Sequence, residues 1–354
     1  MVMQTYALQA GRLEKFSGQI LKHAMVTECL TRGGRQVQMP KNASKTYIAR
    51  RFVPYGATTS QPNRFFQDAT TVDRPAAMVA AHATTDGVTA TPDSIVPQDV
   101  TVVMQQYSCL YGFTDQTYDM HEDDIPKAMV EQTGQRVTLV NEMINYGALK
   151  ATTNQFYGGT GNSVSTVNGG LTLGLLRKIA KSLQMNHGAP VTKVLDASGL
   201  YNTEAVAEGY IVYVSVEAEP DIRDLTNFIP AEKYASGKPM PNEIGKCERF
   251  RFITTPEFPS LQDGGAAIGS TGLYSTTGTS IDVYTGLVVA ADAWSQIAVR
   301  GKNSIDSTFI PPGVKSKSDP HGQRGYAGAI WWKGVMVENN GWCAAFNVGL
   351  KTLV

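Results

Sequence analysis

The sequence predicts a mixed α+β fold, and three features of the chain support this. Two runs of alternating apolar residues, one through Tyr47, Ala49 and Phe52 and one from Asp99 to Thr114, predict β-strands. A long helical pattern, Ile125–Asn154, follows them, and the rest of the chain alternates shorter helices with strands. At 354 residues the chain exceeds what one compact core usually serves, so we expect two packed regions or one domain with long excursions.

The N-terminal third predicts an arm followed by an extended hairpin. Residues 1–34 have a modest helical pattern from Leu13 to Leu30 and end at Gly33-Gly34. Between the two predicted strands, the stretch from Gly56 to Pro97 has little periodicity and few large apolar residues. A loop of this length is unusual inside a compact domain, and a lone two-stranded hairpin is barely stable in water. We therefore expect the hairpin to reach outward and to be ordered by neighbouring chains.

The segment from Ile125 to Asn154 predicts the longest helix. Asp123 or Asp124 can cap it, Pro126 lies near its first turn, and acidic residues lie at the positive end of the helix dipole. Such a helix would run about 45 Å at 1.5 Å per residue, which suits a strut. Its predicted apolar stripe consists of Ile125, Met129, Val137, Val140, Ile144 and Ala148.

The C-terminal half predicts an α/β body. After the Gly- and Ser-rich link 158–170, the patterns predict a helix at 171–186, a strand at 210–216, a short helix opened by Pro220, a strand at 280–290 and a helix from Asp292. The final stretch, 326–350, predicts a β-hairpin. Its Asn340-Gly341 pair is typical of a type I′ turn, and alternating apolar residues flank it.

Composition excludes several classes of protein. Hydrophobic residues make up 42%, yet no apolar run is long enough to span a membrane, and the N-terminus lacks the pattern of a signal peptide. We therefore expect a protein that stays in the cytoplasm where it is made. Lys plus Arg equals Asp plus Glu, 31 of each, so the basic excess of a tight DNA binder is absent. Cys29, Cys109, Cys247 and Cys343 lack zinc-ligand spacing and predict free thiols.

Common catalytic motifs are missing. Gly159–Ser163 lacks the lysine of a phosphate-binding loop, and neither a G-x-S-x-G elbow nor an H-E-x-x-H motif occurs. The run His121-Glu122-Asp123-Asp124 could suggest a metal or acid–base site, but an acidic helix start explains it. We predict no catalytic residue, no metal site and no cofactor, and therefore no enzyme.

Three further pairs have a structural explanation beside a functional one. Asp319 and His321 could form a base with its orienting group, but turn chemistry around Pro320 is favoured. Trp331-Trp332 could stack a sugar or base, but on a strand the two point to opposite faces, which favours burial. Arg50-Arg51 could bind phosphates, and a salt bridge at the base of the strand is at least an equal alternative.

The order of these segments resembles that of the major capsid proteins of tailed bacteriophages with the Hong-Kong-97-like fold, in the N-four-like phage branch. The similarity covers about 40–354, and several segments carry it: MPKNASKTYIARRFVPYGATT, TTDGVTATPDSIVPQDVTVVMQQY, EIGKCERFRFITTPEF, DVYTGLVVAADAWSQIAV and DPHGQRGYAGAIWWKGVMVENNGW. Arg50-Arg51-Phe52, Gln106-Tyr107 and Asp319-Pro320 with Gln323-Arg324-Gly325 are the most telling residues.

The resemblance implies a division of the chain into five parts. These are an N-terminal arm (1–34), an extended loop that lies over an adjacent subunit (35–108), a peripheral domain with the spine helix (109–170), an axial domain (171–304) and the C-terminal strands of the peripheral domain (305–354). It implies a structural, non-catalytic subunit that assembles as pentamers and hexamers into an icosahedral shell, made in the host cytoplasm and found in the virion. The shell would enclose double-stranded DNA without sequence-specific binding. Decoration, portal and scaffolding proteins are the further partners it implies.

Two departures from the family pattern lead to predictions. Some members join neighbours through a Lys–Asn isopeptide bond, but no lysine lies between Gly56 and Pro97, and Lys41 and Lys45 flank only the base of the loop. We predict no covalent mesh. No long charged helical prefix precedes the arm, so we also expect no large N-terminal processing and a separate scaffolding protein if one is needed.

Two other functions compete with this interpretation. A tail-tube or decoration protein would not need a long spine helix between an extended hairpin and an α/β body. A cytosolic α/β enzyme would need Asp292 or the His121 run to act, and no nucleophile, metal set or phosphate loop supports it.

Overall fold

The computed structural model describes residues 25–40, 44–57, 62–64, 74–89, 92–121, 124–195, 203–234, 239–269, 271–299 and 305–351. The predicted helix from Leu13 to Leu30 lies mostly outside these residues, and its described part, 25–30, is not helical.

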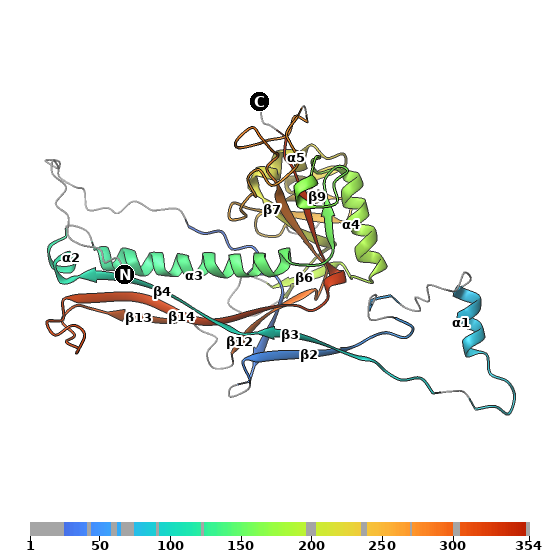
Figure 1. The fold of residues 1–354 in the computed structure, drawn as a ribbon, viewed down its shortest axis with the longest axis horizontal. Coiled ribbons are helices and arrows are strands. Elements are labelled where there is room, and N and C mark those ends of the chain that lie inside the picture. Colours follow the sequence, from blue (N-terminus) through green and yellow to red (C-terminus); the bar gives the residue numbers. More distant parts are fainter. Residues whose placement is uncertain are drawn as a thin grey trace.

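The molecule is elongated, with a long helix lying along a long sheet and an α/β body at one end (Figure 1). The helix is α3 (Ile125–Lys150), and the strands beneath it are β4 (Gln105–Thr114), β13 (Asp306–Ile310) and β14 (Arg324–Val337). The short helix α2 (Asp115–Met120) joins β4 to the start of α3. A hairpin of β2 (Thr46–Phe52) and β3 (Pro97–Val103) projects away from the body.

The long sheet has five strands in the order β1-β12-β14-β13, with β4 also paired to β14. The first part of β14 lies between β4 and β13, and its last residues pair with β12 (Trp294–Val299). Strand β1 (Arg35–Met39) adds to β12 in parallel. The sheet therefore joins distant parts of the chain. Strand β14 alone contacts β4, which begins at residue 105, and β12 and β13, which begin at residues 294 and 306.

The α/β body is built on an eight-stranded sheet, in the order β5-β15-β11-β7-β10-β9-β8 with β6 paired to β7. The bounds of these strands are β5 Gln155–Tyr157, β6 Val191–Leu195, β7 Thr203–Ser215, β8 Phe228–Pro230, β9 Glu243–Cys247, β10 Phe250–Thr255, β11 Tyr284–Val289 and β15 Cys343–Val348. One face packs against α4 (Leu173–Met185) and the other against the C-terminal end of α3. Because the central strands are covered on both faces, β10 and β11 are buried along their whole length, although β10 also carries the buried polar residues Arg251 and Thr254.

The spine helix was predicted well at its start and less well elsewhere. Asp124 caps α3, with its side chain accepting from the backbone N–H of Lys127 at 3.2 Å. The helix ends at Lys150, four residues earlier than predicted, and its 26 residues span about 39 Å. Of the predicted apolar stripe, Val137 is fully buried, whereas the buried face also carries the polar residues Thr133, Glu142 and Asn145.

Several other predicted elements are confirmed with shifted bounds. The helix at 171–186 is α4, with Thr172 as its cap, and the strands at 210–216 and 280–290 correspond to β7 and β11. The short helix around Pro220 is α5 (Glu219–Arg223). A helix that was not predicted, α1 (Arg74–His82), lies within the long loop between β2 and β3.

The helix predicted from Asp292 is wrong. Asp292 has a φ of 51°, which suits a turn, and the next residues form β12. Trp294 and Ile297 have helical spacing, but the residues between them are buried as well. Those residues are the polar Ser295 and Gln296, and because a strand covered on both faces can bury polar residues too, the spacing of apolar residues could not separate it from a helix.

The predicted C-terminal hairpin is also wrong. Strand β14 belongs to the long sheet and β15 to the sheet of the α/β body, so the chain crosses between two sheets instead of turning back. Asn340–Trp342 form a 3₁₀ turn, held by the Asn339 side chain, which accepts from the N–H of Gly341 at 3.0 Å. The predicted strand from Asp99 to Thr114 is divided in a similar way at Met104, because β3 pairs with β2 and β4 pairs with β14.

Candidate assembly interface

The β2–β3 hairpin has two faces with different surroundings. Residues paired across the strands point to the same side, so Tyr47 and Val102 lie on one face while Ile48 and Thr101 lie on the other. Tyr47, Ala49, Val100 and Val102 pack against a cluster formed by Met39, Met104, Ile297 and Met336. This inner face fixes the root of the hairpin to the long sheet.

The outer face of the hairpin is exposed and largely apolar. Ile48 is 57% exposed, Phe52 64% and Val103 58%. Val96 and Ile95, which precede β3, are also exposed. We call Ile48, Phe52, Ile95 and Val103 the outer hairpin patch. Large apolar side chains that gather on one exposed face mark a site of protein contact.

An ion pair lies within the outer face. The guanidinium of Arg50 donates to both carboxylate oxygens of Asp99, at 2.7 and 2.9 Å, and these two residues are direct cross-strand partners. The hydrogen bond from Arg50 holds the pKa of the Asp99 carboxyl below its usual value. Arg51 points to the other side, where its Nε donates to Gln98 at 2.9 Å. The salt-bridged strand base is therefore confirmed for Arg50.

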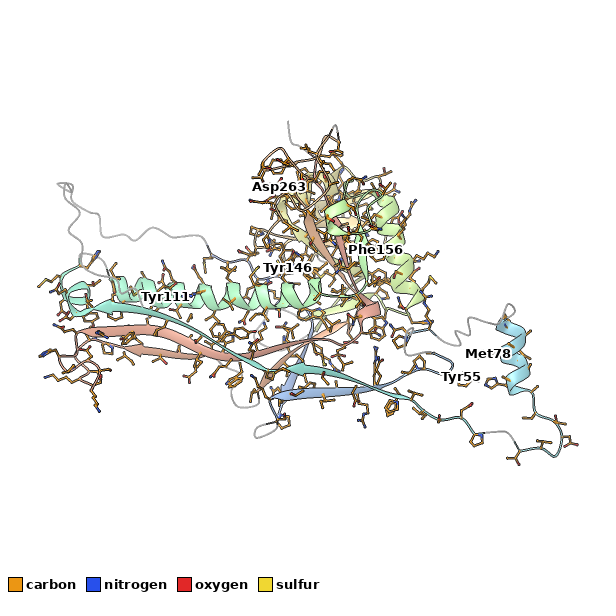
Figure 2. The ribbon with its side chains drawn as sticks, in the orientation of Figure 1. Tyr55, Met78, Tyr111, Tyr146, Phe156 and Asp263 are labelled. Carbon is orange, nitrogen blue, oxygen red and sulfur yellow. The ribbon has the colours of Figure 1, made fainter. Side chains whose placement is uncertain are left out.

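Beyond the strands, the hairpin continues into a segment that lies far from the body (Figure 2). Helix α1 begins at Arg74 and ends at His82, whose ring meets that of Tyr55 edge-on at 5.2 Å between centroids. Met78 and Val79 on this helix are exposed. A nine-residue helix is marginal in water without a surface to pack on.

A second apolar surface lies on the long sheet, on the side away from α3. Tyr107, Cys109, Ala329 and Trp331 face the helix and pack against its Val137. By alternation along the strands, the opposite face carries Leu110, Ile310 and Ile330, each between 37% and 47% exposed. No described segment of the chain covers these three side chains. The described residues thus leave two apolar surfaces exposed.

Among the residues weighed as catalytic or metal candidates, Asp319 has a structural role. Among the residues described, no group of three His, Cys, Asp or Glu side chains could hold a metal ion. Asp319 accepts from the N–H groups of Gly322 at 3.2 Å and Arg324 at 2.9 Å, which is turn chemistry as predicted. His121 follows α2 at its C-terminal end, while Glu122 and Asp123 lie outside the described residues.

The two tryptophans pack inside the protein and the cysteines are free thiols, as the structural interpretation of each predicted. Trp331 is buried and its ring N–H donates to Asn141 Oδ1 of α3 at 3.0 Å, whereas Trp332 packs on the cluster at the hairpin root. All four cysteines are free and buried. Within the part of the chain that the structure describes, no helix is both long and apolar enough to cross a membrane.

A buried polar cluster escaped the sequence reasoning. Glu142 accepts from the N–H groups of Leu30 at 3.0 Å and Thr31 at 2.8 Å, and Lys333 donates to Gln296 Oε1 at 3.1 Å. The side chain of Gln296 in turn donates to the carbonyls of Thr31 and Gly33. Glu142 was a possible signal, because it interrupts the apolar side of α3, but no local pattern indicates its partners. The cluster anchors the segment that leads out of the N-terminal region.

Comparison with known proteins identifies the architecture. No protein-family model matches the chain. The capsid of Ralstonia phage GP4 contains a chain that superposes with a TM-score of 0.63 at 11% identity, covering 99% of both chains. The chain has the fold of a tailed-phage capsid protein. The capsid fold recurs in the acid-stable capsid of Helicobacter pylori bacteriophage KHP30, with a TM-score of 0.59, 10% identity and coverage of 99% and 100%.

A curated relative also shares sequence with the chain. The major capsid protein of Pseudomonas phage KPP21 is 25% identical over 187 residues, which is 49% of this chain and 47% of that protein. The chain therefore matches about half the length of that relative.

Proposed function

We propose that this chain is a major capsid protein, a structural subunit that assembles into the icosahedral head of a tailed phage and resides in the virion. The observation that carries the proposal is the outer hairpin patch, which projects from a complete capsid fold and has no partner within the described chain. An isolated monomer in water gains no stability from an exposed apolar surface. A closed shell, by contrast, repeats the same contact in every subunit.

The proposed contact is overlap between neighbours. The hairpin of one subunit lies over the next, burying Ile48, Phe52 and Val103, and the segment with α1 extends the same contact. In the proposed division of the chain, 1–34 is the arm, 35–108 the extended loop, 109–170 and 305–354 the peripheral domain and 171–304 the axial domain. Zero net charge favours this assembly, because it limits repulsion among many packed copies.

The proposed subunit is not an enzyme and holds its neighbours without covalent bonds. The long loop between Gly56 and Pro97 has no lysine, so an amine for an isopeptide bond is missing from its tip. Boiled particles should therefore give a single band near 38.2 kDa on a denaturing gel, and a ladder of larger species would contradict this. Enclosed double-stranded DNA, portal, decoration and scaffolding proteins, and the N-four-like branch belong to the same proposal.

A charge placed on the outer hairpin patch tests the function. The double variant Ile48→Asp/Phe52→Asp should remain folded, because both side chains are exposed, but it should fail to form shells. The conservative variant Ile48→Val/Phe52→Leu keeps the surface apolar and should assemble. Negative-stain images and sedimentation velocity distinguish shells from subunits, and circular dichroism checks the fold. Shells formed by the aspartate variant would contradict the overlap, and rods formed by the unmodified protein would favour a tail-tube protein instead.

A further inference from the structure

A polar cavity lies at the root of the hairpin, where four parts of the chain meet. Its volume is about 450 Å³. Its walls come from Arg51 and Gln98 of the hairpin, the loop 62–64, the crossover 339–341 between the two sheets, and residues near the ends of α3 and α4. The cavity therefore touches the hairpin, the long sheet and the α/β body together.

The described residues that line the walls carry two positive charges and no negative one. Arg51 and Arg64 line the cavity, and the remaining polar side chains are amides and hydroxyls. Within the described part of the chain, no Asp or Glu contributes to the lining. The nearest acidic residue in sequence to the crossover, Glu338, has its carboxylate bound by Arg35 at 2.8 Å.

Arg51 is a half-buried cation, and no described carboxylate forms an ion pair with it. Its Nε donates to the side-chain oxygen of Gln98 at 2.9 Å and its Nη1 to the backbone carbonyl of Glu338 at 3.3 Å. Burial lowers the pKa of Arg51. Its neighbour Arg50, on the exposed face, has Asp99 as a partner. The charge of Arg51, which no described carboxylate balances, thus lies on the side of the hairpin that faces the cavity.

The second cation is held in place by amides. Asn63 and Asn339 exchange two hydrogen bonds, each of 2.7 Å, which fasten the loop carrying Arg64 to the crossover. Arg64 itself is partly buried and makes no hydrogen bond or ion pair with any described residue. On the opposite wall, Asn154 is fixed by Ser182, whose hydroxyl donates to it at 3.2 Å. Asn63 and Asn339 thus bind each other, while the Arg64 guanidinium and the N–H groups of Arg51 other than those bound to Gln98 and Glu338 are available to a ligand.

We propose that this cavity binds one oxyanion group, a phosphate or a carboxylate. A partly desolvated cation without an anion is costly, and a bound oxyanion removes that cost. The planar guanidinium matches the geometry of both groups. A ligand held by Arg51 and Arg64 joins the hairpin root to the crossover, so its binding fixes the direction of the hairpin.

Binding of inorganic phosphate to dilute full-length subunits tests the site. Added phosphate, against chloride at the same ionic strength, should raise the melting temperature of the unmodified protein in a saturable way. Arg64→Gln and Arg51→Gln should each weaken phosphate binding at least about tenfold, because each removes a charged hydrogen bond. Arg50→Gln removes the same charge one residue away, on the other face, and should bind phosphate as the unmodified protein does. Equal responses of all four proteins, or no saturable response in any, would overturn the proposal.

A second measurement separates the two sources of the oxyanion. If free phosphate is the ligand, assembled particles bind it as dilute subunits do. If a carboxylate of a neighbouring copy fills the cavity, particles take up no phosphate, and the arginine variants weaken the particles. Particles that neither bind phosphate nor weaken in the arginine variants would count against the site. Because the first test uses dilute subunits, its outcome does not depend on whether the protein forms shells.

Discussion

Lys333 offers the sharpest prediction about stability. It lies in the middle of the long sheet with its side chain 8% exposed, and its ammonium donates to Gln296 Oε1. Burial lowers the pKa of Lys333 from 10.5 to about 8, and the negative charges of Glu142 and Glu28 oppose only part of this effect. The folded protein therefore releases this proton at a lower pH than the unfolded chain.

The sign and size of the pH dependence follow from proton linkage. Between pH 8 and 10.5 the unfolded chain carries the proton and the folded protein does not, so the free energy of unfolding rises with pH. The slope is about 1.4 kcal/mol per pH unit and the total about 3 kcal/mol. Below pH 8 both states are protonated, and the full cost of burying the charge remains.

The variant Lys333→Met removes this titration while keeping the length of the side chain. Urea unfolding of dilute subunits at pH 7.5 and about pH 9.5 should give a steeper gain in stability for the unmodified protein than for Lys333→Met, by about 2 kcal/mol. The control Lys127→Met, at an exposed position of α3, should keep the unmodified slope. The reasoning is refuted if Lys333→Met gains as much stability with pH as the unmodified protein.

Two further predictions concern glycine and the buried carboxylate. Gly134 lies on the exposed side of α3 with open space around it, so Gly134→Ala should raise the free energy of unfolding by about 0.5–1 kcal/mol. Gly286→Ala should lower it by about 1–3 kcal/mol, because the added methyl group would overlap the ring of Phe346; thermal unfolding separates the two. Glu142→Leu should lower the free energy of unfolding by about 2–6 kcal/mol, because it leaves the N–H groups of Leu30 and Thr31 unpaired. Its control, Glu131→Leu, changes an exposed residue of the same helix and should alter the free energy of unfolding by about 0.5 kcal/mol or less. Similar urea midpoints for these two leucine variants would contradict that account.

Much of the local structure could be predicted from the sequence, because its signals are local. The start of α3 follows from Asp124 and Pro126, and α4 follows from its apolar spacing and its Thr172 cap. The two strands of the hairpin follow from alternation, and the order of segments resembles one family of capsid proteins. The ion pair of Arg50 with Asp99 required only that β2 and β3 be neighbours.

The tertiary structure alone decided how strands are shared between the two sheets. Alternating residues in β14 and β15 predict two strands but do not say which partners each will take, so a hairpin and a crossover have the same pattern. β12 was mistaken for a helix for a related reason, since a strand buried on both faces can also bury polar residues and then lacks the period that distinguishes it from a helix. Likewise, the cavity of Arg51 and Arg64 and the cluster of Glu142 and Lys333 join residues far apart in the chain. Periodicity describes what each segment can form, whereas pairing and burial depend on the segments that pack against it.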